Sequence, residues 1–316
     1  MKILLPRTDQ LRPDLPAGVT AAEYDSLGSI PEEHRDADVL VVWGGRPDRI
    51  AALPETLPNL RWIQALAAGP DALLTAGLPA HIRISTGRGL HDRTVTEHAI
   101  ALALRLLTRA DVAARAQAAH EWSRELNRVR PVRIPERVDS FVGAQVLIWG
   151  FGSIGQNLAR VVDALGAASV RGVARSAGQR DGYDVVTADT VDEALAGTDV
   201  LFLVLPTSPS TEKVLNADRL AALPAHAYVV NVGRGSTVDE DALLDALRAG
   251  TIGGAALDVT ATEPLPAESP LWDAPNLLIT PHQAGNRADR GGELIAENLR
   301  RYLAGEALVN EVDRGA

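Results

Sequence analysis

The sequence of 316 residues predicts an α/β protein made of two doubly wound domains, each built around a parallel sheet. Three observations lead to this prediction. Residues 1–93 alternate short apolar segments with segments of helical spacing. Residues 94–119 then have the spacing of one long helix with a wide apolar stripe. From Ala144 the alternation returns with nearly continuous apolar runs, which are typical of parallel strands covered by helices on both faces.

The N-terminal part is expected to contain four strands and two helical connections. The strands are expected at residues 2–6, 38–43, 60–66 and 81–85, and the helices at residues 31–37 and 47–57. The segment 127–143 is rich in arginine and proline. We expect it to be an ordered excursion or an interface arm rather than part of a core.

The C-terminal part repeats the strand–helix alternation. Further strands are expected at residues 146–150, 169–174, 199–205, 227–232, 253–259 and 276–280. A helix over 239–250 should end at the capping residue Gly250. We expect a last helix, 287–304, to pack back on the N-terminal unit. The predicted domains are therefore a discontinuous one, residues 1–93 with 286–316, and an inserted one, residues 94–285.

The most informative segment is Val146–Gln156, which reads VLIWGFGSIGQ. An apolar strand is followed by Gly150, Gly152 and Gly155, spaced G-x-G-x-x-G, and then by a helix. The first glycine permits a tight turn, the second lets the backbone approach a pyrophosphate, and the third lets the helix pack close to the strand. This arrangement predicts a Rossmann-type dinucleotide site; the alternative is a purely structural glycine turn.

Composition excludes several function classes. The net charge of −10 argues against a nucleic-acid-binding surface. The absence of cysteine excludes disulfides, thiolate zinc sites and a cysteine nucleophile. The seven histidines are scattered, and no metal site is expected. No apolar run has the length of a signal-peptide core or a membrane span, so we expect a cytoplasmic protein without a membrane partner.

Three polar clusters follow predicted strands of the second domain. They are residues 231–235 around Arg234, Asp258 with Glu263, and Pro281 with His282. Ligands bind beyond the carboxyl ends of parallel strands, so these clusters should face the same crevice as the glycine turn. Taken singly, each cluster could be an ordinary solvated loop. An arginine, an acid and a histidine in one nucleotide crevice suit the reduction of a 2-keto acid.

Each residue type fits one step of that reaction. The planar guanidinium of Arg234 matches a carboxylate in a bidentate manner and can polarise the ketone. His282 can donate a proton to the developing alkoxide because its pKa lies near neutrality. Glu263 is the natural partner to stabilise the imidazolium. The hydride would come from a nicotinamide cofactor.

Several motifs together resemble the D-isomer-specific 2-hydroxyacid dehydrogenase family. The matching segments are GFGSIGQNLA, LPTSPSTEKVLNADRLAALPAHAYVVNVGRGSTVDEDALLDAL, GGAALDVTATEPLPAESPLW and LLITPHQAG, with weaker likenesses at 67–71 and 95–106. The resemblance implies a Rossmann-type cofactor domain inserted in a smaller flavodoxin-like substrate domain. It also implies a homodimer with the segment after the long helix in the interface.

The resemblance further implies individual roles. Arg234 would bind and polarise the substrate, His282 would be the acid/base, Glu263 would tune His282, and Asp258 would hold the nicotinamide carboxamide. Backbone amides around Ala68 and Gly69 would receive the substrate carboxylate. Cofactor contacts are implied for Gly150, Gly152, Ser153, Ile154, Gly155, Pro206 and Val232.

Three departures from the family pattern bear on specificity. Members that use NAD have an acidic residue after the strand 169–174, whereas this chain has Ala174, Arg175 and Ser176. An arginine and a hydroxyl suit the 2′-phosphate of NADP, as in the NADP-using glyoxylate and hydroxypyruvate reductases, so we expect NADP to be preferred over NAD. The alternative is that Arg175 is solvated and Asp181 or another acid binds the ribose. The other departures are the rim residues Gln283 and Arg287 and, after Gly69, Pro70.

Further residues are weaker candidates for substrate contacts. Arg46, Arg88, His91 and Arg93 could select a second anionic group but are expected to be surface or hinge residues. His98 is expected to be structural and Trp122 to pack at the interface arm. Two alternative functions share the fold: a nucleotide-sensing regulator, and a formate dehydrogenase. Against the latter stands Glu263, where that enzyme has glutamine.

Overall fold

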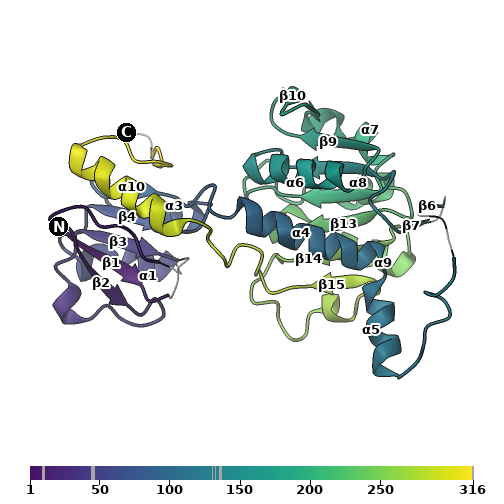
Figure 1. The fold of residues 1–316 in the computed structure, drawn as a ribbon, viewed down its shortest axis with the longest axis horizontal. Helices are drawn as coiled ribbons and strands as arrows, with labels where there is room; N and C mark the ends of the chain where they lie inside the picture. The colour runs from purple at the N-terminus through teal and green to yellow at the C-terminus, as the bar shows by residue number, and fades with distance from the viewer. Residues whose placement is uncertain (9–10, 44–46, 130, 132, 135–136, 315–316) are drawn as a thin grey trace. The chain divides into compact units, whose positions relative to one another are not determined.

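The chain folds into two compact units, which are described separately. In the computed structural model the described residues are 1–8, 11–43, 47–129, 131, 133–134 and 137–314. Unit 1 comprises Met1–His91 and Arg287–Ala316, and unit 2 comprises Asp92–Asn286. The boundaries expected from the sequence, at 93/94 and 285/286, differ from these by one or two residues. Figure 1 shows the ribbon of both units with many of the elements labelled.

Unit 1 contains a five-stranded parallel sheet in the order β2-β1-β3-β4-β5, the order of flavodoxin-like folds. The strands are β1 (Lys2–Pro6), β2 (Thr20–Tyr24), β3 (Val39–Val42), β4 (Trp62–Ala65) and β5 (Arg83–Ser85). The helices are α1 (Pro47–Ala51), α2 (Leu53–Thr56), α3 (Asp71–Thr75) and α10 (Gly291–Ala304). The expected packing of the last helix on the N-terminal unit is confirmed, because Ile295 and Leu299 share an apolar cluster with Ile3 and Val39.

Unit 2 begins with two helices, α4 (Asp92–Leu107) and α5 (Ala110–Ala118), and contains an eight-stranded sheet. Six strands of that sheet follow the Rossmann order, β11-β9-β8-β12-β13-β14, with β15 and β10 at its two ends. These strands are β8 (Gln145–Trp149), β9 (Ser169–Val173), β10 (Gly178–Arg180), β11 (Tyr183–Val186), β12 (Val200–Leu203), β13 (Tyr228–Asn231), β14 (Gly254–Leu257) and β15 (Leu277–Ile279). The remaining elements are α6 (Ser153–Ala164), α7 (Val191–Leu195), α8 (Ala217–Ala222), α9 (Glu240–Ala249) and the two-residue strands β6 (Arg133–Ile134) and β7 (Arg137–Val138).

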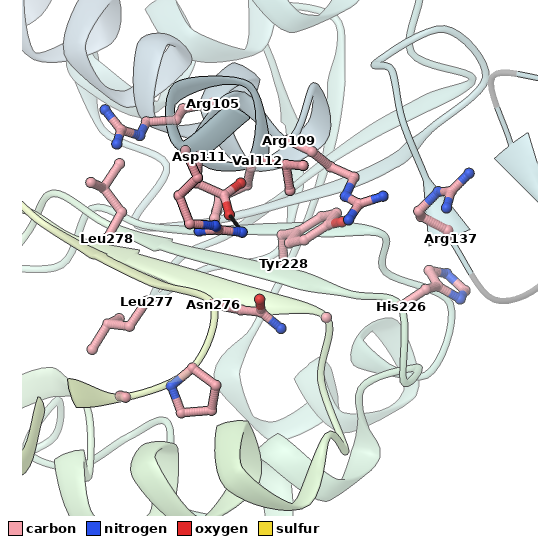
Figure 2. A pocket seen from close by; sticks show the side chains of 15 residues that line it. Arg105, Arg109, Asp111, Val112, Arg137, His226, Tyr228, Asn276, Leu277 and Leu278 are labelled. Atoms are coloured by element: carbon pink, nitrogen blue, oxygen red, sulfur yellow. Dashed lines mark ion pairs between the residues drawn. The ribbon is translucent and has the colours of Figure 1, made fainter. Parts of the chain in front are cut away.

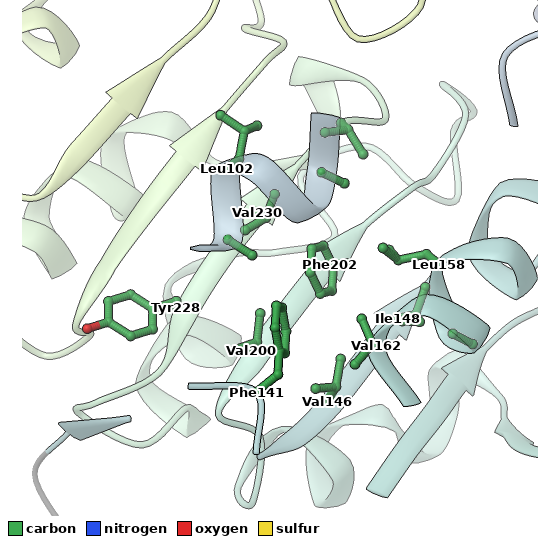
Figure 3. Packing of buried hydrophobic residues seen from close by; sticks show 14 of the residues in the cluster. Leu102, Phe141, Val146, Ile148, Leu158, Val162, Val200, Phe202, Tyr228 and Val230 are labelled. Atoms are coloured by element: carbon green, nitrogen blue, oxygen red, sulfur yellow. The ribbon is translucent and has the colours of Figure 1, made fainter. Parts of the chain in front are cut away.

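Alternating side chains of the central strands fill two cores on opposite faces of this sheet. In β12, Val200 and Phe202 pack with α4 and α6, whereas Leu201 and Leu203 pack with α7, α8 and α9. Figure 3 shows the first of these cores. Burial on both faces explains why these strands read as continuous apolar runs in the sequence. Among the described residues, we find no helix with the length and apolar character needed to cross a membrane.

Several sequence-based predictions of elements were wrong. The helix expected over 94–119 is two helices, because Arg109 adopts a left-handed conformation with φ of 54°, which ends a helix. The segment 31–37 forms only a short 3-10 turn, Glu32–His34, and 47–57 is divided into α1 and α2. The strands β2, β10 and β11 were not predicted.

The end of the segment 127–143 also differs from expectation. Val138 and Phe141 are almost fully buried, and the Phe141 ring stacks on Phe202 with ring centroids 6.4 Å apart. Figure 3 shows Phe141 beside Phe202, Val146 and Val200. Because aromatic side chains bury a large apolar area, this part of the segment belongs to the core of unit 2 rather than to an excursion.

Candidate active site

The glycine turn after β8 has the geometry that a pyrophosphate site needs. Gly150 has a φ of 110°, and a Cβ there would lie 2.4 Å from the carbonyl oxygen of Val204. A Cβ on Gly155 would lie 2.3 Å from the carbonyl oxygen of Gly150. At Gly152, the N-cap of α6, a Cβ would meet nothing within 4 Å. The chain itself therefore requires the first and third glycines, whereas the second keeps the space before the helix open.

The first turn of α6 presents backbone N–H groups to that space, since such groups lack partners within their helix. Ser153 and Ile154 are its first residues. The Ser153 hydroxyl donates to Oδ1 of Asp92 over 3.1 Å. Open space, amide donors and a helix N-terminus together fit the pyrophosphate of a nicotinamide dinucleotide.

Arg234 lies on a rigid loop after β13. The buried Asn231 accepts from the N–H of Gly233 (3.0 Å) and donates to the carbonyl oxygen of Arg234 (3.1 Å). The Thr237 hydroxyl donates to the same carbonyl oxygen over 2.6 Å. The Arg234 guanidinium donates to the carbonyl oxygen of Gly233 over 2.8 Å. The backbone that carries the arginine is thus fixed by two buried side chains.

The loop after β14 packs directly against the Arg234 loop. A Cβ on Gly235 would lie 1.9 Å from the carbonyl carbon of Thr260, so only glycine allows this approach. The Thr260 N–H donates to Oε1 of Glu263 over 3.1 Å, and the Ala261 N–H donates to Oε1 of Glu240 over 2.6 Å. These contacts place the Glu263 carboxylate close to the arginine loop.

Glu263 and His282 form a pair. Nδ1 of His282 lies 2.7 Å from Oε2 of Glu263, and the two side chains are 46% and 37% exposed, respectively. The hydrogen bond to Glu263 raises the pKa of His282 above its ordinary value, against opposing effects of burial and of the Arg234 charge. Burial raises the pKa of Glu263, but the hydrogen bonds from His282 and Thr260 outweigh it and leave that pKa lowered. The positive charge of Arg234 lowers the pKa of both groups as well.

Asp258 is buried beneath the loop that carries His282. Its Oδ1 accepts from the Thr280 hydroxyl (2.5 Å) and from the N–H of Gln283 (3.0 Å), and its Oδ2 accepts from the N–H of Ala284 (3.0 Å). The residue is only 1% exposed. Asp258 therefore orders residues 280–284; its predicted contact with a nicotinamide carboxamide remains a prediction.

The remaining predicted residues lie in different places. Pro206 is exposed after β12, and Val232 is buried directly after β13, both beyond carboxyl ends of strands in unit 2. Ala68 and Gly69 lie in unit 1, between β4 and α3. Their role in receiving a substrate carboxylate remains a prediction.

The loop after β9, residues 174–177 and here called the specificity loop, is contacted by an arginine that the sequence reasoning missed. Arg175 and Ser176 are exposed after β9, as expected. Arg180, at the end of β10, donates to the Ser176 hydroxyl (2.7 Å) and carbonyl (3.0 Å), and its Nη1 lies 3.4 Å from the carbonyl oxygen of Phe151. It therefore bridges the specificity loop and the glycine turn. The signal for this hairpin was Asp181-Gly182, a typical two-residue hairpin turn.

The weaker candidates are placed as follows. Arg88 and Arg93 are exposed, and Arg46 lies outside the described residues. His91 is not a solvated hinge residue as expected: it is 6% exposed, and its Nε2 lies 2.6 Å from the carbonyl oxygen of Leu66. Trp122 is 83% exposed.

A cavity of about 500 Å³ lies at the opposite, amino end of the β13–β15 strands. Figure 2 shows the arginines that line it, among them Arg109 and Arg137, around Tyr228 and His226. Arg109 pairs with Glu125, and Arg137 with Asp139. Because ligands of open α/β sheets bind at carboxyl ends, we assign no substrate to this cavity.

Comparisons with known proteins agree with this geometry. Residues 100–284 match the family model described as D-isomer specific 2-hydroxyacid dehydrogenase, NAD binding domain. Over 298 residues the chain is 34% identical to glyoxylate/hydroxypyruvate reductase A of Serratia proteamaculans, covering 90% of this chain and 88% of that protein.

Two solved structures share the whole fold. One is a D-isomer specific 2-hydroxyacid dehydrogenase family protein of Aeromonas salmonicida, with a TM-score of 0.84, 29% identity and 99% coverage of both chains. The other is an NADPH-dependent glyoxylate/hydroxypyruvate reductase of Sinorhizobium meliloti in complex with NADP and sulfate, with a TM-score of 0.79, 28% identity and coverage of 99% and 98%. These relatives lend no support to a regulatory role.

Proposed function

Because the chain belongs to the D-isomer specific 2-hydroxyacid dehydrogenase family, oxidoreductases that act on CH–OH donors with NAD(P), we propose that it reduces a small 2-keto acid of the glyoxylate or hydroxypyruvate type with NADPH. The observation that carries this proposal is the Glu263–His282 pair, which lies with the adjoining Arg234 loop beyond the carboxyl ends of strands β13–β15. The named reductase relatives support the substrate class.

Arg234 binds the substrate in this proposal. Its guanidinium can contact the carboxylate in a bidentate manner and draw electron density from the ketone oxygen. The loop contacts from Asn231 and Thr237 fix its backbone before the substrate arrives, so little reorganisation is needed during the reaction.

His282 holds the proton that the reaction consumes. The raised pKa keeps the imidazolium populated at higher pH than an isolated histidine would allow. Because Nδ1 faces Glu263, Nε2 is the atom left to donate the proton to the ketone oxygen as it becomes a hydroxyl. A bound nicotinamide supplies the hydride.

The preference for NADP rests on the loop after β9. Arg175 is exposed there, and the Arg180 guanidinium and Ser176 hydroxyl lie together beside the glycine turn. A 2′-phosphate would gain charge-assisted hydrogen bonds from such groups. Asp181, the alternative ribose ligand, faces Arg160 instead, with Oδ2 lying 2.6 Å from Nη2 of that arginine.

A homodimer is also part of the proposal. The family resemblance implies an interface in the segment after α4. Exposed apolar side chains occur on α4 and between α5 and β8, namely Leu104, Trp122, Val129 and Val142. Such side chains are available for a protein–protein contact.

A kinetic screen tests the proposed function. The purified protein is assayed by cofactor oxidation with glyoxylate, hydroxypyruvate, pyruvate and a bulkier 2-keto acid, each with NADPH and with NADH. We expect the highest kcat/KM for glyoxylate or hydroxypyruvate with NADPH. A protein that oxidises neither cofactor with any of these acids would contradict the proposal.

A further inference from the structure

One contact of the active-site region has no part in the proposed chemistry. His98 lies on α4, and its Nε2 is 3.1 Å from Oδ1 of Asp258 and 3.0 Å from the Thr280 hydroxyl oxygen. The His98 side chain is 12% exposed and the Asp258 side chain 1%. A helix that packs beneath the sheet thus contacts the carboxylate that orders the loop of His282.

That loop needs external support. His282 adopts a left-handed conformation with φ of 49°, which residues other than glycine keep only where their surroundings enforce it. The His282 N–H donates to the carbonyl oxygen of Asp258 over 2.7 Å. The Asp258 carboxylate holds the next two N–H groups, those of Gln283 and Ala284. Asp258 therefore fixes the backbone from which the His282 side chain projects.

We propose that His98 is a positioning residue that donates its Nε2–H to Asp258 and so holds His282 in register with Glu263. The Thr280 hydroxyl donates to the same Oδ1, which leaves His98 to fix the carboxylate from the side of α4. The inference rests on the proposed function only in taking His282 as the proton donor.

Loss of the N–H that His98 donates should change the pKa of His282, which can be measured directly. The charged groups that act on His282 are Glu263, Arg234 and Asp258, and the hydrogen bond that His282 donates to Glu263 dominates. If Asp258 turns, the loop shifts and the Glu263–His282 contact lengthens. The pKa of His282 then falls toward its ordinary value of about 6.5.

The same sheet offers a matched control. Nε2 of His226 lies 2.7 Å from Oδ1 of Asp199, with the two side chains 12% and 0% exposed. This pair resembles His98–Asp258 in chemistry and burial, but it precedes strands β13 and β12, at the amino edge of the sheet. A substitution of His226 removes comparable structural support far from the loop of His282.

The experiment compares His98→Asn, His98→Gln and His226→Asn with the wild type. The glutamine amide nitrogen can occupy the place of Nε2, whereas the shorter asparagine cannot reach Asp258. The pKa of His282 is measured in the protein without substrate by NMR titration of the seven histidines, assigned with His282→Asn. The kcat and KM for keto-acid reduction are measured in parallel.

We expect His98→Asn to lower the pKa of His282 and to reduce kcat roughly tenfold to a hundredfold, with KM little changed, because a small misplacement of a catalytic group has this effect. His98→Gln should keep the pKa of His282 and the kcat near their wild-type values. His226→Asn should leave both quantities unchanged while lowering the melting temperature. If His98→Asn does not fold, Thr280→Val removes the neighbouring donor to Asp258 and should lower the pKa of His282 in the same way.

An unchanged pKa of His282 in His98→Asn, or equal impairment in His98→Gln, would overturn the inference. So would a fall in the pKa of His282 in His226→Asn. Because the titration needs no turnover, it decides the positioning role even if the protein reduces none of the tested keto acids.

Discussion

Oε2 of Glu263 lies 2.7 Å from Nδ1 of His282, although the two residues stand on different loops, after β14 and β15. The contact turns one ring nitrogen toward a carboxylate and leaves the other for chemistry. It is also the main reason why the pKa of His282 is raised.

Glu263→Gln should narrow the pH range of keto-acid reduction. Reduction needs protonated His282, and the rate falls as the pH rises through the folded-state pKa, which Glu263 raises. Without the carboxylate, that pKa is lower, so the alkaline limb of the kcat/KM profile moves to lower pH. The exposed Glu268→Gln in the same loop serves as control. A solvent isotope effect establishes whether proton transfer limits the rate. If it does and the alkaline limb stays where it is in the wild type, Glu263 does not set the pKa of His282.

Arg234→Lys should lose activity and keep the fold. Lysine retains the charge but cannot contact a carboxylate with two parallel hydrogen bonds. We expect kcat/KM to fall by a factor that corresponds to about 3 kcal/mol of transition-state binding. Steady-state kinetics and circular dichroism check this result, with Arg248→Lys on the exposed side of α9 as control. A folded Arg234→Lys protein with wild-type kcat/KM would exclude Arg234 as the substrate-binding residue.

Arg175→Ala should weaken NADPH binding and leave NADH binding nearly unchanged. Arg180→Ala also removes the contact with Phe151 in the glycine turn, so it should weaken the binding of both cofactors, and that of NADPH more. One charge-assisted hydrogen bond is worth about 1.5 to 3 kcal/mol, which corresponds to roughly ten- to a hundredfold in Kd. Fluorescence titration with both cofactors measures the difference, with the exposed Arg171→Ala in β9 as control. Equal affinities of the wild type for NADPH and NADH would show that the loop after β9 does not select the 2′-phosphate.

Phe141→Ala should destabilise unit 2, because the ring is buried against Phe202. Removal of such a side chain costs about 3 to 5 kcal/mol of unfolding free energy. Val161, in α6 of the same unit, is 37% exposed, and Val161→Ala should change that free energy by less than about 0.5 kcal/mol. Urea unfolding followed by circular dichroism compares the two; equal effects would mean that Phe141 is not part of the core.

The oligomeric state tests the proposed interface. Sedimentation velocity should give a species of about twice the chain mass of 33.5 kDa. Trp122→Asp places a charge on an exposed apolar side chain and should shift the equilibrium toward the monomer. A wild type that sediments as a monomer at all concentrations would remove the homodimer from the proposal.

The central strands could be predicted because burial on both faces of a sheet requires nearly continuous runs of apolar residues. Strands such as β12 and β13 are covered on both faces, so nearly every residue is apolar. The strand β2, with the sequence TAAEY, lies at a sheet edge and is largely exposed, so its sequence has no continuous apolar run. The break at Arg109 was also hidden, since nothing in its neighbours' side chains demands a left-handed residue.

The grouping of site residues followed from topology, because the carboxyl ends of parallel strands meet at one edge. This rule brought Glu263 and His282 to the same place from the sequence alone. It says nothing about side chains that reach the site from other elements. Arg180 arrives through a hairpin, and His98 through a helix that packs beneath the sheet, so their contacts with Ser176 and Asp258 required the structure.

Deuterium transfer to hydroxypyruvate from NADPH that carries deuterium at both C4 positions, followed in a single turnover by mass spectrometry of the product, tests the central claim most directly. The account predicts that the wild type places deuterium at C2 of the hydroxy acid. It also predicts that His282→Asn binds NADPH normally but transfers deuterium on the order of 10² to 10⁴ times more slowly. A wild-type product without deuterium at C2, or transfer at the wild-type rate by His282→Asn, would contradict it.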